Sequence, residues 1–487
     1  MLPTIATGNV ASAIGGGYEV ANSCRFAEGD SAHLSRTFGS AGNRRTFTVS
    51  FWYKTTVKIT TGQSVMFGAI FDAAADGSNS DDMYFHTNRL NFSGYYGSTQ
   101  FILRTTAKYR DPSAWTHFVV AFDTTQGVAA NRIKMYANGT QITAFDEETY
   151  PAENFQTSYM NLDRLHNIGT LVNSDGFPLD GYLAEFCFID GSALTPSSFG
   201  EFDEDSPTIW KPKDVSDLTF GTNGCYLDFE DSSNLGNDAN GGTDWDETNL
   251  AATDQASDSP TNNFATLNPL NVPTSNGPTF SEGNTTSISS TTSGSYMWGG
   301  SSTIGMTNGK WYLEAKATVD GTYSRNVLGV TGNATDIARN NASIYAVNYG
   351  SAWYSSDGVV KINTSTGFSG STYTTGDILS IAIDLDNLKI YYAKNGTWEN
   401  SGDPTSGATG TGALSLTAVA SLPDGAYFFA QTDDTSSTSP SKFEFNFGNP
   451  AFAISSGNSD GNGYGNFEYS VPSGYYSLCT KNLAEYG

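Results

Sequence analysis

The sequence has few cysteines and few basic residues, and it lacks long apolar runs. Over its 487 residues no long stretch repeats apolar side chains at helical spacing, and none approaches the length of a membrane span. The four cysteines lie far apart and form no CxxC pair, which excludes a zinc ribbon and a dithiol redox motif. A helical bundle, a membrane-spanning protein and a disulfide-framed scaffold are therefore not expected.

The charge is strongly one-sided. Lys and Arg number 24 against 50 Asp and Glu, which gives a formal net charge of −26 at pH 7. Such a chain repels nucleic acid and anionic membrane surfaces, so neither is an expected partner. The opening run MLPTIATGNVASAIGGG has no basic start and no apolar core, so it is not typical of a secretory signal. For a protein acting outside the cell that makes it, we expect another route, such as release by lysis within a virus particle.

Residues that favour turns and strands are abundant instead. Gly occurs 52 times, aromatic residues make up 13% of the chain, and charged residues make up only 15%. Gly, Asn and Asp supply the backbone angles of tight turns, so this mixture predicts many short strands. The length exceeds what one hydrophobic core supports, which predicts two all-β domains with connecting segments.

Apolar patterning predicts an antiparallel β-sandwich in the first part of the chain. Residues 46–53 alternate between the two faces of a strand, whereas 116–123 and 181–191 are nearly all apolar, as strands covered on both faces would be. Asn138-Gly139 between two further short runs is a strong hairpin signal.

The series FTVSFWYK, AWTHFVVAFD, IKMYANGTQI and FPLDGYLAEFCFIDGSALTPSSFGEF resembles the laminin-G-like, concanavalin A-like lectin/glucanase fold. It looks in particular like the version found in tail-fibre and other virion proteins of marine bacteriophages. The resemblance implies a jelly-roll sandwich over residues 20–203, preceded by an N-terminal arm over 1–19. It carries no catalytic motif.

A second sandwich is expected over residues 291–452. The runs NGKWYLEA, LGV, GDILSIAIDLDNLKIYYAKNG and FNFG resemble the SPRY (B30.2) domain. That resemblance implies a bent antiparallel sandwich whose loops bind peptides or other ligands, without enzymatic activity. Between the two domains, residues 204–290 are acidic and aperiodic, which favours an irregular connector with one short strand pair. The tail over 453–487 is expected either to dock on a domain or to contact a neighbouring subunit.

No catalytic constellation is recognisable, so an enzyme is not expected. A glucanase of this fold needs two carboxylates at a fixed separation, and the run Glu-x-Asp-x-x-Glu that would supply them is absent. The nearest acids, at 203–205 and 228–231, lie in the connector. The four histidines are widely spread, and His117 within an apolar run is expected to be structural.

One acidic run is a candidate calcium loop, since hard carboxylate oxygens suit Ca²⁺ and laminin-G-like folds often hold that ion at an edge of the sandwich. A solvated acidic loop without metal explains the same run equally well. The candidate ligands are Asp72, Asp76, Asp81 and Asp82.

Aromatic residues flanked by Gly and Ser are the candidate sugar-binding groups. Sugar rings stack on aromatic faces while nearby amides and acids bind hydroxyls, although packing in the core or at a sheet edge explains such residues as well. The candidates are Tyr95, Tyr96, Tyr349, Trp353 and Tyr354.

Together these features lead to the hypothesis of a bacteriophage virion protein, a fibre or host-recognition component that binds host cell-surface glycan. Single sugar contacts are weak, so several copies are expected, as a homo-oligomer and most simply a trimer, held by other virion proteins in the particle. A capsid decoration or head-fibre protein is the structural alternative. A glycan-degrading enzyme is a third possibility, which needs a cleft with paired carboxylates.

Overall fold

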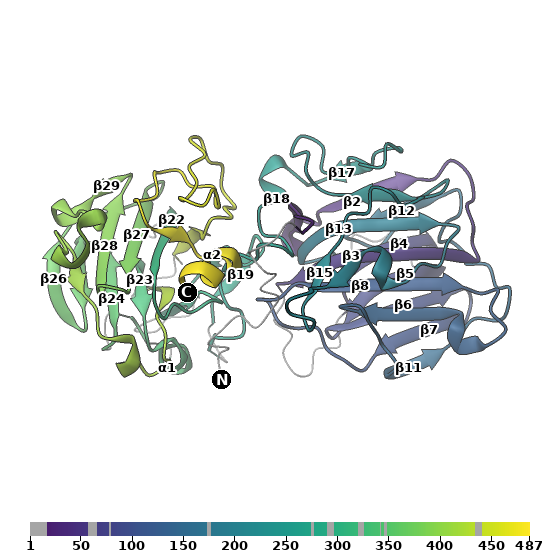
Figure 1. Cartoon of the computed structure of the whole chain (residues 1–487), viewed down its shortest axis with the longest axis horizontal. Helices are drawn as coiled ribbons and strands as arrows, with labels where there is room; N and C mark the ends of the chain where they lie inside the picture. Colours follow the sequence, from purple (N-terminus) through teal and green to yellow (C-terminus); the bar gives the residue numbers. More distant parts are fainter. Residues whose placement is uncertain are drawn as a thin grey trace. The chain divides into compact units, whose positions relative to one another are not determined.

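The computed structural model describes residues 17–56, 66–76, 79–172, 177–273, 277–289, 297–319, 326–340, 342–344, 348–433 and 441–487. The chain divides into two compact units, here called the first unit (Ile14–Thr261) and the second unit (Asn262–Gly487). Each is built almost entirely from antiparallel strands, as the turn-rich composition predicts (Figure 1). No helix among the described residues is long and apolar enough to cross a membrane.

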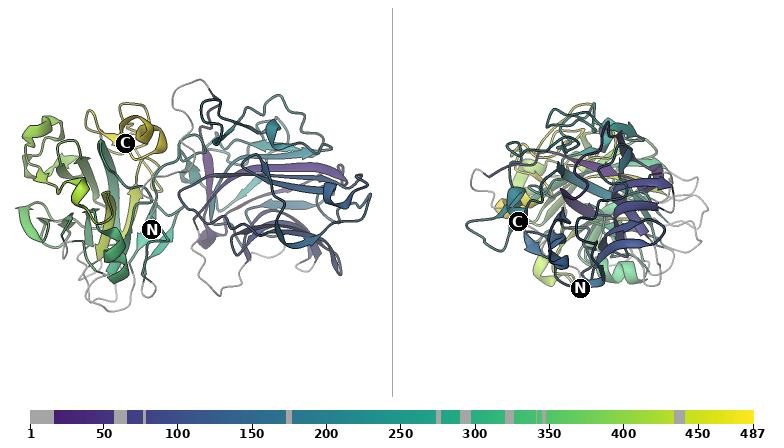
Figure 2. Two further views of the ribbon diagram at one scale, coloured as in Figure 1. Left: turned by 60° about the horizontal axis from the view of Figure 1, so that its bottom comes forward. Right: turned by 90° about the vertical axis from the view of Figure 1, so that its right-hand side faces the viewer.

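The first unit is a sandwich of two eight-stranded sheets, and the left view of Figure 2 shows them facing each other. Across sheet I the order is β10 (Thr140–Gln141), β9 (Ile133–Ala137), β8 (Thr116–Asp123), β3 (Thr46–Thr55), β13 (Gly181–Asp190), β1 (Ser23–Phe26) and β18 (Gln255–Ala256), with β16 (Cys225–Leu227) beside β13. Across sheet II it is β11 (Phe145–Thr149), β7 (Thr99–Thr105), β6 (Arg89–Tyr95), β5 (Asn79–His86), β4 (Met66–Asp76), β12 (Leu165–Ile168), β2 (His33–Thr37) and β17 (Asp246–Thr248).

Aromatic rings fill the space between these two sheets. Phe47 of β3 stacks on Phe122 of β8, with ring centroids 4.6 Å apart, and meets Phe92 of β6 edge-on at 6.5 Å. Tight ring contacts of this kind add to the burial of large apolar area. The alternation predicted for 46–53 therefore points one face of β3 into the core, as expected.

The other face of β3 is also buried, which alternation alone does not reveal. Trp52 stacks on His117, and the indole of Trp210 donates to His117 Nδ1 at 3.0 Å. Trp210 belongs to a small hairpin of β14 (Gly200–Phe202) and β15 (Trp210–Pro212). Because Nδ1 accepts that hydrogen bond, Nε2 carries the proton and donates to Ser50 Oγ at 2.9 Å. His117 is thus a satisfied core residue, as its apolar surroundings predict.

The second unit contains a nine-stranded and a six-stranded sheet. Sheet III runs β19 (Thr279–Ser281), β20 (Thr286–Ile288), β32 (Lys442–Asn446), β22 (Lys310–Val319), β27 (Ile378–Asp384), β28 (Lys389–Lys394) and β29 (Thr397–Trp398), with β30 (Leu414–Ser415) beside β28 and β33 (Tyr476–Ser477) beside β22. Sheet IV runs β21 (Met297–Ser301), β31 (Phe428–Asp433), β23 (Asn326–Thr331), β24 (Gly350–Tyr354), β25 (Val359–Ile362) and β26 (Ser365–Ser369). In the sequence, Asp386-Asn387 between two apolar runs predicts a hairpin, and the antiparallel pairing of β27 with β28 confirms it.

Helices are short in the described part of the chain. The α-helices there are α1 (Ala334–Asn340) and α2 (Thr480–Tyr486). The 3-10 turns are η1 (Glu28–Asp30), η2 (Ala129–Asn131), η3 (Pro196–Ser198), η4 (Ala252–Asp254), η5 (Glu399–Ser401), η6 (Pro404–Thr409) and η7 (Val419–Ser421).

The segment expected as an irregular connector over 204–290 is instead divided between the two units. Its β16, β17 and β18 extend the sheets of the first unit, and its β19 and β20 extend sheet III. Trp245 and Leu235 from this segment are buried in the first core. Its acidic side chains, which suggested an irregular connector, cap turns and form ion pairs. Asp residues readily hydrogen-bond nearby backbone N–H groups in turns.

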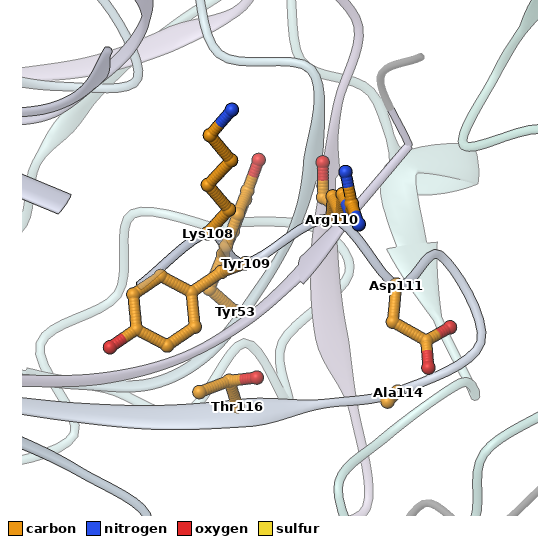
Figure 3. Close-up of a pocket in the computed structure, with 8 residues that line it drawn as sticks. Tyr53, Lys108, Tyr109, Arg110, Asp111, Ala114 and Thr116 are labelled. Carbon is orange, nitrogen blue, oxygen red and sulfur yellow. The ribbon is translucent and has the colours of Figure 1, made fainter. Parts of the chain in front are cut away.

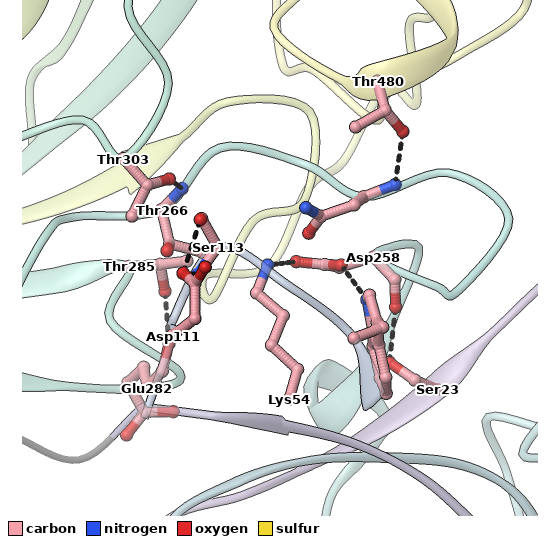
Figure 4. A network of polar contacts seen from close by, with 12 residues as sticks. Ser23, Lys54, Asp111, Ser113, Asp258, Thr266, Glu282, Thr285, Thr303 and Thr480 are labelled. Atoms are coloured by element: carbon pink, nitrogen blue, oxygen red, sulfur yellow. Dashed lines mark hydrogen bonds and ion pairs between the residues drawn. The ribbon is translucent and has the colours of Figure 1, made fainter. Parts of the chain in front are cut away.

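A buried ion pair holds the end of this segment to the first unit (Figure 4). Lys54 Nζ pairs with Asp258, both side chains are fully buried, and Trp115 Nε1 donates to the other carboxylate oxygen at 2.9 Å. Arg25 approaches Asp254 in the same segment at 3.5 Å. Unpaired buried charge would be costly, so these pairs hold residues more than 200 positions apart in sequence together.

The tail over 453–487 lies on the second unit. Strand β33 runs parallel to β22, and the carboxylate of Asp460 accepts hydrogen bonds from the Ser477 backbone N–H at 2.9 Å and from Asn482 Nδ2 at 2.8 Å. Glu314 of β22 accepts the backbone N–H groups of Glu468 and Tyr469 at 2.9 and 2.8 Å. The tail therefore docks on a domain of its own chain, which is the first of the two placements expected for it.

Candidate functional site

The five candidate aromatics fall into two groups by exposure. Trp353 and Tyr354 lie inside β24, between β23 and β25, and both side chains are buried. Trp353 packs edge-on against Tyr373, with ring centroids 5.3 Å apart, and its indole donates to the Ser371 carbonyl. A buried ring offers no face to a sugar, so the assignment of these two residues as binding groups was wrong. Their Ser-rich flanks belong to strands and turns rather than to an open loop.

Tyr349 is partly buried and packs against the core of the second unit. Its backbone has φ = 72°, a left-handed conformation that residues other than Gly rarely adopt. Its N–H donates to Asn363 Oδ1 at 2.8 Å, which stabilises the turn before β24. Tyr349 is therefore only partly accessible to solvent.

Tyr95 and Tyr96 are the exposed pair. They occupy the tip of the hairpin between β6 and β7, with 43% and 62% of their surface accessible. The tip is held by its own polar groups, since Gly97 N–H donates to Asn79 Oδ1 at 2.9 Å and Gln100 Nε2 donates to the Ser98 carbonyl at 3.0 Å. The structure thus places two aromatic rings on an ordered, solvent-facing turn.

Polar side chains lie along the neighbouring strands on the outer face of sheet II, but Asn91 and Tyr84 among them are buried and offer no open contact to a sugar. Strand register places Asp82 opposite Ser93, Tyr84 opposite Asn91 and Asn91 opposite Arg104, while their sequence neighbours Met83, Phe85, Phe92 and Leu103 point into the core. Alternation in the run from 79 to 95 carries the signal for this polar face, which the sequence analysis did not single out.

The four candidate calcium ligands do not form one site. Strand alternation points Asp81 toward the core side of sheet II, where it accepts the backbone N–H groups of Tyr159 and Met160 at 2.6 and 3.0 Å. Asp72 and Asp82 face each other on the outer side. Asp76 ends β4, and its side chain lies outside the described residues. One strand cannot direct adjacent acids to the same face, so the expected four-ligand cluster was wrong.

The remaining pair, Asp72 and Asp82, behaves as two coupled carboxyls. Burial raises the pKa of Asp72 well above its usual range, and the hydrogen bond to the neighbouring Asp82 raises it further. Val172 N–H donates to the second oxygen of Asp72, and Ser80 Oγ donates to Asp82 at 2.6 Å. Each carboxyl has one buried oxygen without a donor, and one proton shared between the two carboxyls would satisfy both oxygens.

These residues do not fit a calcium site by themselves. Calcium takes about six to eight oxygen ligands, and within the described ranges no group of three acidic, His or Cys side chains gathers that could hold a metal. Asp81 adds nothing, because burial raises its pKa to about 6 and two backbone N–H groups already bind it.

The acids considered for catalysis serve local structure. Asp203 Oδ1 accepts the backbone N–H groups of Asp205 and Ser206 at 3.0 and 2.9 Å, and Asp228 Oδ1 accepts that of Glu230 at 3.1 Å. Both act as turn-capping side chains.

One buried acid on sheet I was not anticipated. Glu185 sits at an irregularity of β13 with φ = 51°, and it accepts the hydroxyls of Tyr226 and Tyr18 at 2.9 and 3.1 Å. Burial raises its pKa to about 8, against the lowering effect of the two tyrosine hydrogen bonds. A strained backbone and a protonated acid are found at functional sites, but this carboxyl is buried and opens to no described cavity.

Residues 27–198 match the model of the concanavalin A-like lectin/glucanases superfamily. Among proteins of curated function, none matches this sequence. The solved structures similar to the chain include the SPRY domain of human HERC1, at 15% identity over 33% of this chain and 87% of that one, with a TM-score of 0.26.

Two further solved structures are similar at the same level. One is a heptameric SAP-like pentraxin from Limulus polyphemus, at 17% identity over 37% of this chain and 80% of that one, with a TM-score of 0.27. The other is domain 4 of the arabinanase AbnA from Geobacillus stearothermophilus, solved with arabinotriose, at 20% identity over 34% and 68% with a TM-score of 0.25. At these TM-scores no ligand and no residue role carries over to this chain.

Proposed function

We propose that this chain is a carbohydrate-recognition protein of a bacteriophage virion, acting in a fibre or in host recognition by binding cell-surface glycan. The observation that carries the proposal is the exposed Tyr95-Tyr96 turn on a sandwich whose residues 27–198 match a lectin/glucanase superfamily model. The virion setting is supported by the resemblance of the first domain to phage fibre proteins.

The chemistry of the turn suits sugar binding. A pyranose ring has a C–H face that stacks on an aromatic ring, and its hydroxyls exchange hydrogen bonds with amides and carboxylates. The side chain of Tyr96 is more exposed than that of Tyr95. Gln100 lies next to Tyr96, with its amide nitrogen 3.3 Å from the Tyr96 carbonyl oxygen. One such contact is weak, so display of several copies, most simply as a trimer, would supply avidity.

Binding without cleavage is part of the proposal. Support comes from the acids considered for catalysis and for metal: Asp203 and Asp228 accept backbone N–H groups in turns, and Asp72 pairs with Asp82. The competing activity, glycan hydrolysis, would need a second carboxylate across a sugar-sized gap.

A glycan array probed with the full chain tests the proposal. We expect binding that drops about tenfold or more in Tyr96→Ala and is largely kept in Tyr96→Phe, because stacking on one ring contributes on the order of 1 kcal/mol or more. Val128→Ala changes an exposed apolar side chain elsewhere in the first unit and serves as control. Equal loss in the control variant, or no bound glycan, would refute the proposal.

Product analysis of the bound glycans separates binding from hydrolysis. Shortened oligosaccharides after incubation with the wild-type chain would favour the enzyme alternative. Labelling of the chain on intact phage particles distinguishes a tail fibre from a capsid decoration or head fibre, which is the structural alternative.

A further inference from the structure

A small pocket opens in the first unit, away from the Tyr95-Tyr96 turn. It lies where β3 ends and β8 begins, under the loop that joins β7 to β8, and its volume is about 190 Å³ (Figure 3). This is below the roughly 300–1,000 Å³ of pockets that hold drug-sized ligands, so it suits a single ring. The lining residues are Tyr53, Thr55, Lys108, Tyr109, Arg110, Asp111, Ala114 and Thr116.

Two basic side chains of this pocket have no partner among the described residues. Lys108 and Arg110 are exposed, and neither makes an ion pair or a side-chain hydrogen bond with any described residue. On the preceding strands, by contrast, Arg104 pairs with Glu147 at 2.9 Å and Arg89 pairs with Asp146 at 2.9 Å. Within the described part of this strongly acidic chain, no acid engages either cation, so both can meet an external anion.

The aromatic wall of the pocket is rigid. Tyr109 meets Phe118 edge-on, with ring centroids 4.6 Å apart, and its backbone N–H donates to the Asn88 carbonyl at 2.7 Å. Tyr53 stacks on Phe85 at 4.6 Å, and its hydroxyl donates to the Asp180 carbonyl at 3.3 Å. Rings held in this way lose little entropy when a ligand packs on them.

The one acid in the lining is turned into its own loop. Asp111 Oδ1 accepts the backbone N–H and the hydroxyl of Ser113 at 2.9 and 2.6 Å. Figure 3 shows Asp111 on the far side of the pocket from Lys108, with the ring of Tyr109 below the lysine. Among the lining residues, two cations therefore stand against one carboxylate that is engaged in its own loop.

We propose that this pocket binds one acidic sugar residue, with its carboxylate or sulfate held by Lys108 and Arg110 and its ring against Tyr109. The proposal rests on the glycan-binding function proposed above and narrows it to anionic glycans. Arg offers a planar pair of N–H donors to a carboxylate or sulfate, and Lys adds a point charge. The shared requirement is an anion carried on a sugar ring.

Titration of the full chain with three soluble oligosaccharides tests the inference. The probes are a uronic acid oligosaccharide, a sulfated oligosaccharide and a neutral oligosaccharide of equal length. We expect at least one acidic probe to bind at least tenfold more tightly than the neutral one, with affinity falling as salt rises, because exposed charges are screened. The two acidic probes distinguish carboxylate from sulfate.

The variant Lys108→Gln/Arg110→Gln is expected to lose at least tenfold of its affinity for the preferred acidic probe. Lys134→Gln/Lys213→Gln removes the same charge elsewhere in the first unit, and we expect less than a twofold change. Equal loss in both double variants would overturn the inference, since only overall charge would then matter. Tyr109→Phe keeps the ring and should keep binding within about threefold.

The two proposals fail in different ways. Neutral glycans that bind and depend on Tyr96, with no preference for acidic probes, would overturn the pocket and leave glycan recognition standing. No binding of any array glycan or probe would overturn both. Acidic-probe binding lost in Lys108→Gln/Arg110→Gln but kept in Tyr96→Ala would establish the pocket as a separate site.

Discussion

The two sandwich units use Gly- and Ser-flanked aromatics in opposite ways. In the first unit, Tyr95 and Tyr96 lie at a hairpin tip where ladder pairing ends, and they remain exposed. In the second, Trp353 lies within the five-residue strand β24, bonded on both sides, and is fully buried. Flanking Gly and Ser therefore do not distinguish a binding loop from a core strand. What decides is whether the ring packs into a core, because Tyr95 is paired on both sides within the ladder and is still exposed.

Two buried carboxylates, one in each unit, are satisfied in different ways. The first unit neutralises Asp258 with the buried cation of Lys54. The second surrounds Glu314 with neutral donors: Tyr312 Oη at 3.0 Å, Asn446 Nδ2 at 3.3 Å and two backbone N–H groups. Either arrangement satisfies the buried acid, but only the first depends on a second charge.

Removing the buried tryptophan should have the largest effect on stability. Trp353→Ala is expected to lower the free energy of unfolding of the second unit by about 3–5 kcal/mol, because a large cavity is left in its core. Denaturant unfolding followed by hydrogen exchange locates the loss. Trp398→Ala, at a partly buried edge position, should cost less. A loss at Trp353 no larger than at Trp398 would contradict the burial.

Breaking the buried ion pair is expected to come next. Lys54→Met leaves Asp258 buried without its cation, which should lower the free energy of unfolding of the first unit by about 3 kcal/mol. Arg104→Met removes a cation from a partly exposed pair with Glu147 and should cost about 1 kcal/mol or less. Urea unfolding of both variants measures the difference. Similar losses in the two variants would show that burial of the ion pair does not increase its contribution to the free energy of unfolding.

The pH dependence of stability tests the protonation of Glu185. Its pKa is raised from the usual 4.5 to about 8 in the folded chain, so the fold binds a proton that the unfolded chain has released. The free energy of unfolding should therefore fall as pH rises from about 4.5 to 8. Glu185→Gln should flatten this slope, measured by urea unfolding at several pH values. An unchanged slope would contradict a protonated Glu185.

The smallest effect on stability is expected at the exposed turn. Tyr96→Ala should change the free energy of unfolding by no more than about 0.5 kcal/mol, because its ring makes few contacts that unfolding would lose. Thermal unfolding beside the glycan array separates stability from binding. A loss of several kcal/mol would mean that Tyr96 is a packing residue, like Trp353.

Much of the fold could be predicted because strand signals are local. The alternation at 46–53, the apolar run at 116–123 and the hairpin at Asp386-Asn387 each correspond to strands of the structure. The role of the acidic run at 72–82 was harder to predict from the sequence. Its composition indicated oxygen ligands, but the alternation of β5 places Asp81 and Asp82 on opposite faces. Applying the strand period to the acids, and not only to the apolar residues, would have separated them.

The sequence by itself determined the all-β class, the excess of acids and the positions of the main strands, because composition and side-chain period act over a few residues. Only the tertiary structure decided what the segment 204–290 does. Asp254 and Asp258, near the end of the first unit's sequence, form ion pairs with Arg25 and Lys54 near its beginning. It also decided that Trp353 is buried while Tyr96 is open, and that Lys108 and Arg110 share a pocket with Tyr109. Those outcomes depend on which distant strands lie side by side, and no local pattern carries that information.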